Sequence, residues 1–162
     1  MTDFKIEYLN TLPDDISEKI HQGHIMDEAT GGIVCNYKMF SLLVKNNDGT
    51  AIGALSAYTA FSEIYVVDIW IDPNYRKLGL GRNLLKELEK HFSDKGYNNI
   101  NLVTSQFQAP DFYKKCGFEI EFIRENKYNP ELTKIFFIKY FNNPNQHQGI
   151  LKDINHDTKK QR

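Results

Sequence analysis

The stretch YRKLGLGRNLL, residues 75–85, places two glycines one residue apart among basic side chains. A β-branched apolar run precedes it and an apolar stripe at helical spacing follows it, so the stretch should join a buried strand to an amphipathic helix. The first amide groups of a helix have no partner within the helix and carry partial positive charge. Because Gly79 and Gly81 lack a Cβ, the backbone there can close around an anion. The stretch therefore predicts a binding turn for a diphosphate group.

Two well-known phosphate-binding loops do not fit this spacing. A P-loop has four residues between its glycines and then Lys-Ser or Lys-Thr, which the stretch lacks. A dinucleotide-binding loop needs a third glycine where Leu84 stands, and an acidic residue about 20 positions later, where the chain reads NNINLVTS. A tight turn without a ligand remains the alternative for a Gly-x-Gly pattern considered alone.

Strands and helices are expected to alternate along the rest of the chain. The evidence is alternation of apolar residues for strands, apolar stripes for helices, and Gly or Pro at their ends. Strands are expected at 4–8, 39–45, 51–60, 62–71, 98–105, 118–123 and 133–141. Helices are expected at 13–31, as one or two short helices, and at 80–92 and 110–116. Asp-Gly inside NNDGT, residues 46–50, predicts a hairpin between the second and third strands.

Length and composition predict one globular domain in 1–141, followed by a mobile polar tail in 142–162. The 20 basic and 21 acidic side chains leave a net charge of −1, which favours neither nucleic acid nor an anionic membrane as partner. No apolar run approaches the ~20 residues that span a bilayer. The two cysteines and the absence of a basic-then-apolar leader favour a cytoplasmic protein with reduced thiols.

The pattern Arg76-x-x-Gly79-x-Gly81, after a strand ending in IDPNY, resembles the coenzyme A loop of the GNAT superfamily of N-acetyltransferases. About 30 residues further on, FYKKCGF at 112–118 resembles the FYxKxGF motif of that family. The resemblance covers roughly residues 40–140. It implies a mixed α/β fold, with a central twisted and mostly antiparallel sheet of about seven strands. It also implies a splayed central strand pair and helices on both faces of the sheet.

The resemblance implies acetyl-CoA as acyl donor and indicates where the molecule binds. A strand that splays from its neighbour, usually at a bulge, would hold the pantetheine arm through β-like hydrogen bonds. Gln106 stands where an asparagine often contacts the cofactor in the family. The residues expected to bind the cofactor are Ile69, Trp70, Ile71, Arg76, Lys77, Leu78, Gly79, Leu80, Gly81, Arg82 and Gln106.

Acyl transfer to an amine needs a neutral nucleophile and a proton for the departing thiolate. Tyr113 matches the family tyrosine that donates to the sulfur, although packing of the short helix is the alternative. Glu63 and Asp68 are the candidates for the base. Asp68 ranks slightly higher, because a carboxylate within an apolar run needs a reason. Their odd separation would put them on opposite faces of a regular strand, and a bulge between them could bring both to one face.

The resemblance predicts transfer of the acetyl group directly to a primary amine of a small molecule, within a ternary complex. A protein lysine or N-terminal acetyltransferase is the alternative enzyme, and an acyl-CoA-binding sensor without catalysis is the alternative outside enzymes. His21 and His24 lack further nearby ligands, so no metal is expected. The expected partners are acetyl-CoA and an amine acceptor, for a monomer or homodimer.

Overall fold

The computed structural model describes residues 4–142 and divides into two compact units, Met1–Cys35 and Asn36–Arg162. The prediction of one domain over 1–141 therefore stays a prediction. Of the expected tail, residues 143–162 lie outside the described part of the chain. No helix within residues 4–142 is long and apolar enough to cross a membrane.

Residues 4–35 of the first unit contain one helix, α1 (Asp14–Gly31). Its first turn carries two acidic residues, which complement the helix dipole, and it ends at Gly32, whose φ of 66° lies in the left-handed region. No residue of α1 is buried. The strand expected at 4–8 is wrong, because that segment has no regular secondary structure and the side chains of Phe4, Ile6 and Tyr8 are exposed.

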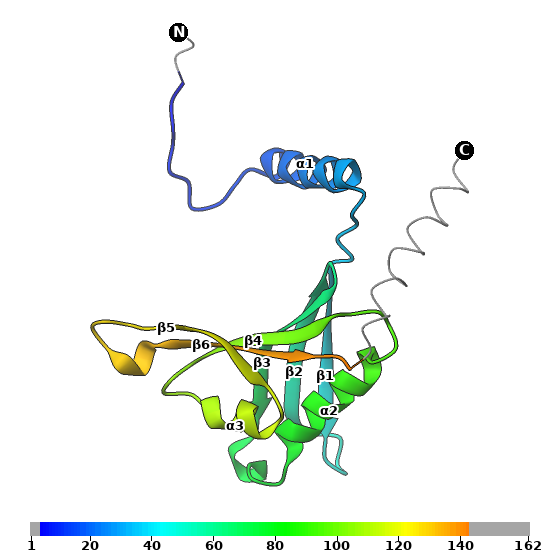
Figure 1. The fold of residues 1–162 in the computed structure, drawn as a ribbon, viewed down its shortest axis with the longest axis vertical. Coiled ribbons are helices and arrows are strands. Elements are labelled where there is room, and N and C mark those ends of the chain that lie inside the picture. Colours follow the sequence, from blue (N-terminus) through cyan, green and yellow to red (C-terminus); the bar gives the residue numbers. More distant parts are fainter. Residues whose placement is uncertain (1–3, 143–162) are drawn as a thin grey trace. The chain divides into compact units, whose positions relative to one another are not determined.

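The second unit is built on a six-stranded sheet in the order β1-β2-β3-β4-β6-β5 (Figure 1). All neighbouring strands are antiparallel except β3 and β4. The mixed α/β, mostly antiparallel prediction is confirmed, with six described strands instead of about seven. The strands are β1 (Lys38–Lys45), β2 (Ala51–Ala60), β3 (Glu63–Ile71), β4 (Asn99–Ser105), β5 (Glu119–Arg124) and β6 (Lys134–Tyr140).

The middle of β3 contains the irregularity that shapes the sheet. Val66 pairs with Ala57 of β2, but Asp68 pairs with the adjacent Ser56, so Val67 is an extra residue and forms a bulge. The parallel pairing of β3 with β4 covers four residue pairs and ends at Val66 and Leu102. The expected bulge and the expected splay of the central strands are therefore both present, at the same place.

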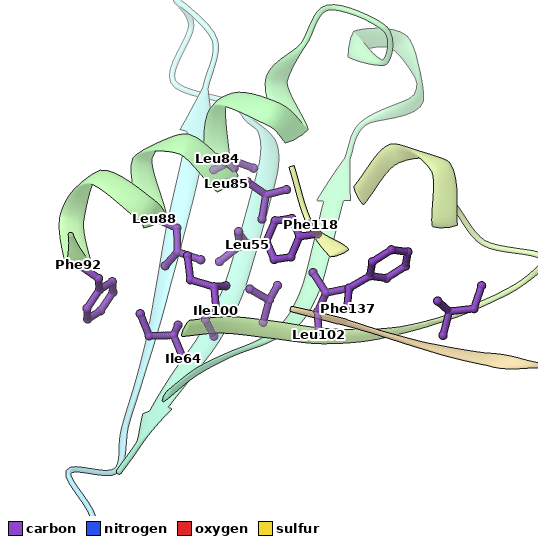
Figure 2. Packing of buried hydrophobic residues seen from close by; sticks show 13 residues of the cluster. Leu55, Ile64, Leu84, Leu85, Leu88, Phe92, Ile100, Leu102, Phe118 and Phe137 are labelled. Atoms are coloured by element: carbon purple, nitrogen blue, oxygen red, sulfur yellow. The ribbon is translucent and has the colours of Figure 1, made fainter. Parts of the chain in front are cut away.

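Within residues 36–142, four helices follow the strands or connect them, and the longest is α2. Its apolar stripe packs on the sheet, with Leu84, Leu88 and Phe92 pointing toward Leu55 and Ile64 (Figure 2). These side chains belong to one continuous core. The helices are η1 (Pro73–Tyr75), α2 (Leu80–Phe92), α3 (Pro110–Lys115) and η2 (Pro130–Leu132).

The two faces of the sheet differ in what covers them. The core face carries Leu55, Ile64 and Phe137, and both α2 and α3 contribute to the hydrophobic cluster on it. The outer face carries the alternate side chains, among them Tyr65 and Trp70. Both α2 and α3 thus pack on the core face, and the expectation of helices on both faces stays a prediction.

Replacing a fully buried leucine of α2 should destabilise the fold strongly. Leu88→Ala removes a side chain with 0% exposure and should lower the free energy of unfolding by ~2–5 kcal/mol, measured by urea denaturation. Leu132→Ala, at a position 47% exposed, is the matched control and should change it by less than about 1 kcal/mol. Equal losses in the two variants would contradict the packing described here.

Candidate active site

The turn between β3 and α2 has a backbone suited to an anion. Lys77 and Gly79 have positive φ values of 63° and 81°, and Gly79 is the N-cap of α2. The first helical bond runs from the Asn83 amide to the Gly79 carbonyl, at 3.0 Å. The amide groups of residues 80–82 consequently have no acceptor within the helix, and they carry its positive end. Gly79 supplies the left-handed conformation that starts this arrangement.

Gly81 has a different reason to be glycine. It is buried, and a Cβ built on it would lie 3.0 Å from Cζ of Phe112 in α3. The first turn of α2 thus touches the FYKKCGF segment through a position that has no room for a side chain. The two motifs that carry the family resemblance in the sequence meet in space at this contact.

A cavity of about 870 Å³ opens between the end of β3, this turn and α3, and we call it the β3–α2 cavity. Its size is within the ≈ 300–1,000 Å³ of typical small-molecule sites. Its lining includes four cationic side chains and no carboxylate. The lining residues are Ile69, Trp70, Ile71, Tyr75, Arg76, Lys77, Leu78, Gly79, Leu80, Gly81, Arg82, Asn83, Ala109, Phe112, Tyr113 and Lys115.

The β3–α2 cavity brings together every residue expected to bind the cofactor except Gln106. Gln106 follows β4, is exposed, and donates its backbone amide to the Thr133 carbonyl at 2.9 Å. The sequence interpretation did not single out Phe112 or Lys115 as lining residues. Both belong to the FYKKCGF motif that contains Tyr113, so their place in this motif could have predicted that they line the site.

Tyr113 is held by aromatic packing. Its ring lies 5.1 Å from that of Phe112, 5.6 Å from that of Phe137 and 6.2 Å from that of Phe118, between centroids. Within residues 4–142, its hydroxyl has no hydrogen-bond partner. Burial raises the pKa of Tyr113 above its usual 10, and the charges of Cys116 and Asp68 raise the pKa further. The phenol is therefore protonated at neutral pH and is available to a ligand in the β3–α2 cavity.

Asp68 comes directly after the bulge and before the residues of β3 that line the β3–α2 cavity. It pairs with Ser56, is exposed, and is not itself a lining residue. Its charge adds, after burial and Cys116, to the rise in the pKa of Tyr113. Asp68 and Tyr113 are thus electrostatically linked, although they come from different elements.

Glu63 begins β3 and lies four ladder positions from Asp68, about 13 Å along the sheet at ~3.3 Å per residue. The bulge does bring the two carboxylates to one face, because Glu63 pairs with Ala60 and Asp68 with Ser56. The Glu63 carboxylate already accepts hydrogen bonds from the Tyr65 hydroxyl and from two side-chain amides. These amides belong to Asn99, at 3.1 Å, and Asn101, at 3.4 Å.

The Glu63 carboxylate changes the pKa of Tyr65. The hydrogen bond to Glu63, followed by burial, raises the pKa of Tyr65 to about 12. Its ring stacks on that of Tyr58 at 4.8 Å, and Tyr58 contacts Tyr37 at 5.4 Å. Because the folded pKa lies above the unfolded value of about 10, stability from this group is complete below pH 10. It is lost as the pH rises through about 12.

Glu63→Gln should lower the pKa of Tyr65 from about 12 toward 10, because the neutral amide no longer opposes the phenolate charge. Spectrophotometric titration of tyrosinate would measure the change, with Tyr65→Phe identifying the signal. Glu121→Gln, at an exposed position of β5, should leave the titration unchanged. An unshifted Tyr65 signal in Glu63→Gln would contradict the contact.

Comparison with known proteins agrees with this geometry. Residues 8–118 match the model of the acetyltransferase (GNAT) family, which is more than half of the chain. Blasticidin-S acetyltransferase of Streptomyces morookaense is 27% identical over 92 residues, 56% of this chain and 67% of that protein.

Two solved structures are also similar. An acetyltransferase of Bacillus cereus ATCC 14579 superposes with a TM-score of 0.69 and 26% identity, over 83% of this chain and 97% of that one. A protein assigned as a streptothricin acetyltransferase of Bacillus anthracis str. Ames, in complex with acetyl coenzyme A, has a TM-score of 0.55 and 24% identity, over 64% of this chain and 63% of that one. With two motifs meeting at one cavity and a family match over most of its length, the chain belongs to the GNAT family of acetyltransferases.

Proposed function

We propose that this acetyltransferase moves the acetyl group of acetyl-CoA directly to a primary amine of a small molecule, within a ternary complex. The observation that carries the proposal is the β3–α2 cavity, where the cationic start of α2 and Tyr113 border the same space. A diphosphate and a thioester are the two groups of acetyl-CoA that such a space would need to accept.

The residues present fit the diphosphate of the cofactor. The free amides of residues 80–82 and the positive φ of Gly79 form a concave donor surface at the helix start. Arg76 donates its Nε to the Ile71 carbonyl at 3.2 Å, which anchors this guanidinium at the edge of the β3–α2 cavity. With Lys77 and Arg82 nearby, the cavity carries positive charge without any lining carboxylate.

The pantetheine arm would lie along β3 beyond the bulge. There the side of β3 that faces β4 has no strand partner among residues 4–142, because the pairing ends at Val66 and Leu102. Backbone groups of Ile69 and Trp70 can then bind the amides of the arm as a neighbouring strand would. When bound, acetyl-CoA supplies an acetyl group activated as a thioester.

Tyr113 would hold the proton that the departing sulfur needs. Its raised pKa keeps the hydroxyl protonated through neutral pH, so the proton is in place when the thiolate leaves. The three aromatic contacts orient the ring, and the absence of an acceptor among residues 4–142 leaves the proton uncommitted.

Asp68 is the better candidate for the base that takes a proton from the amine, directly or through water. Glu63 is bound by three donors, and using it as a base would disrupt that network. Asp68 is exposed, forms no ion pair among residues 4–142, and acts electrostatically on Tyr113. Tyr113 as the acid and Asp68 as the base would suit direct transfer of the acetyl group to the amine.

The acceptor class is argued from charge and from the relatives. A carboxylate at the site edge attracts a cationic amine before deprotonation. The names of two similar proteins refer to blasticidin-S and to streptothricin, which supports a small amine-bearing acceptor here. A protein amine and a sensor role remain the alternatives.

A thiol-release assay with purified protein and acetyl-CoA would test the proposal. The panel contains polyamines, aminoglycosides, nucleoside and peptide-like antibiotics, amino-acid derivatives, and peptides with a free N-terminus or lysine. Turnover confined to small amines supports the proposal, and turnover confined to peptides overturns the acceptor class. Cofactor binding without turnover on any amine would favour the sensor.

Tyr113→Phe should reduce kcat by about 10²-fold or more and leave acetyl-CoA affinity nearly unchanged, because only the proton donor is removed. Steady-state kinetics and calorimetric titration would measure the two quantities. Tyr128→Phe, at an exposed position, is the control and should retain full activity. An unchanged kcat in Tyr113→Phe would exclude the phenol from catalysis.

Asp68→Asn should slow the reaction at neutral pH, with a defect that shrinks as the pH approaches ~10, where the amine deprotonates without help. A pH–rate profile of kcat/KM would reveal this convergence. Glu63→Gln is the matched control and should follow the wild-type profile. The reverse assignment of the two profiles would identify Glu63 as the base.

A further inference from the structure

The outer face of the sheet carries a row of acidic and aromatic side chains beside the β3–α2 cavity. Along β3 the row consists of Glu63, Tyr65, Asp68 and Trp70, because the bulge keeps all four on one face. Trp70 also lines the β3–α2 cavity, so the row begins at the proposed reaction site and leads away from it. The two carboxylates lie four ladder positions apart, about 13 Å at ~3.3 Å per residue.

Two stacked tyrosine rings occupy the middle of this row. Tyr65 pairs with Tyr58 of β2, two ladder positions from each carboxylate. Their rings lie 4.8 Å apart between centroids, with an interplanar angle of 11°, and the ring of Tyr37 lies 5.4 Å from that of Tyr58. The face of such a ring attracts an ammonium group and also packs against an alkyl chain. The space over the two rings therefore suits a cation on a carbon chain.

The Glu63 carboxylate is held in place by neutral donors. The Tyr65 hydroxyl and the side-chain amides of Asn99 and Asn101 donate to it, and Asn99 is only 1% exposed, so this donor has a fixed position. These bonds orient the carboxylate and leave its negative charge without a counter-charge, because no Lys, Arg or His of residues 4–142 forms an ion pair with it. A half-buried carboxylate of this kind is stabilised by a nearby cation.

The surroundings of the row do not provide that cation. The row is flanked on the same face by Ala54, Ser56, Tyr58 and Ala60 of β2 and by Asn99 and Asn101 of β4. None of these side chains is basic, and the next outer positions, on β1, are Met39, Ser41 and Leu43. This part of the face therefore carries two negative charges, and electrostatic complementarity favours a cationic ligand.

The separation of the two carboxylates limits which cation can use both. Asp68 adjoins the β3–α2 cavity, where the reacting amine must meet the thioester. Glu63 is too far away to take part in proton transfer there, and its three donors already occupy it. A monoamine that reacts beside Asp68 leaves the Glu63 carboxylate and the two rings unused. A molecule with a second ammonium group about 13 Å from the first contacts both ends of the row.

We propose that the acceptor is an elongated dication, in which one amine reacts beside Asp68 while a second ammonium group binds the Glu63 carboxylate, next to the stacked rings of Tyr58 and Tyr65. This inference rests on the proposed function, because it takes the reacting amine to lie at the β3–α2 cavity. It names the class of acceptor and adds a second cation subsite. It also gives Glu63 a role in binding, which its hydrogen-bonded arrangement suits better than a role as a base.

Steady-state kinetics with saturating acetyl-CoA and two matched pairs of acceptors test the subsite. The pairs are diaminononane with nonylamine and diaminobutane with butylamine, since the longer diamine can span the two carboxylates and the shorter one cannot. For diaminononane, kcat/KM should be at least about tenfold higher than for nonylamine, mainly through a lower KM, because its second ammonium gains charge-assisted and cation–π contacts. The preference for the diamine should be much smaller in the butyl pair.

Two variants change different parts of the subsite. Glu63→Gln removes the charge, and Tyr58→Leu removes one ring but retains the contact between Tyr65 and Glu63. Each should reduce the preference for diaminononane over nonylamine severalfold. In Glu63→Gln the pH dependence of kcat/KM should keep the wild-type shape, which separates loss of a binding group from loss of a base. Glu119→Gln, at an exposed position of β5, is the matched control and should keep the wild-type preference.

The outcomes separate this inference from the function beneath it. Equal kcat/KM within the nonyl pair, or turnover of other small amines but not of diaminononane, overturns the subsite and leaves acetyl transfer to a small amine standing. A preference that is equally strong in the butyl pair overturns the assignment of the second ammonium to Glu63. Binding of acetyl-CoA without turnover of any amine overturns both proposals. Thermal melts of each variant check that the fold is retained.

Discussion

Strands β3 and β4 run in parallel only as far as Val66 and Leu102, and the bulge at Val67 turns the rest of β3 away from a regular ladder. Beyond this point β3 has no strand partner on the β4 side among residues 4–142. A buried unpaired edge is costly in a protein core, so it must face solvent or a ligand. The β3–α2 cavity occupies this place, and its lining begins with Ile69. The proposed cofactor site is thus a consequence of an interrupted sheet.

Packing on the core face holds the elements around the site in place where the pairing of β3 with β4 has ended. Leucines of α2 and Phe137 of β6 belong to one cluster, which positions the start of α2 and the α3 segment against the same sheet. The ring of Tyr113 is oriented by packing against aromatic rings and the hydrophobic core. The placement of its hydroxyl therefore depends on close packing, whereas the placement of Glu63 depends on directional hydrogen bonds.

Most elements of the second unit were predictable from local patterns. The Asp-Gly hairpin, the apolar stripe of α2, and the prolines and glycines at element ends all correspond to observed boundaries. The expected strand at 4–8 failed because the alternation of Phe4, Ile6 and Tyr8 indicates which residues favour burial, but it does not supply a partner. Residue pairing across the sheet is the information that a single sequence lacks.

In the candidate site too, residues close together in the chain were predictable, whereas contacts between distant residues were not. The loop and the FYKKCGF segment predicted most of the cavity lining, because their residues are close in the chain. The choice between Glu63 and Asp68 as the candidate base depends on contacts between residues far apart in the sequence. Asn99 and Asn101, which bind the Glu63 carboxylate, are 36 and 38 positions from it. Gln106 was proposed from motif spacing alone, and its contact with the cofactor stays a prediction.

The contact between Gly81 and Phe112 links the sequence of the loop at 75–85 to that of the FYKKCGF segment. A methyl group at position 81 would lie 3.0 Å from the Phe112 ring. Either α2 and α3 would have to move apart, or position 112 would need a smaller side chain. Either adjustment displaces the residue next to Tyr113. In related chains, an alanine at the position of Gly81 should therefore be accompanied by a smaller side chain at the position of Phe112, so that these two sites covary.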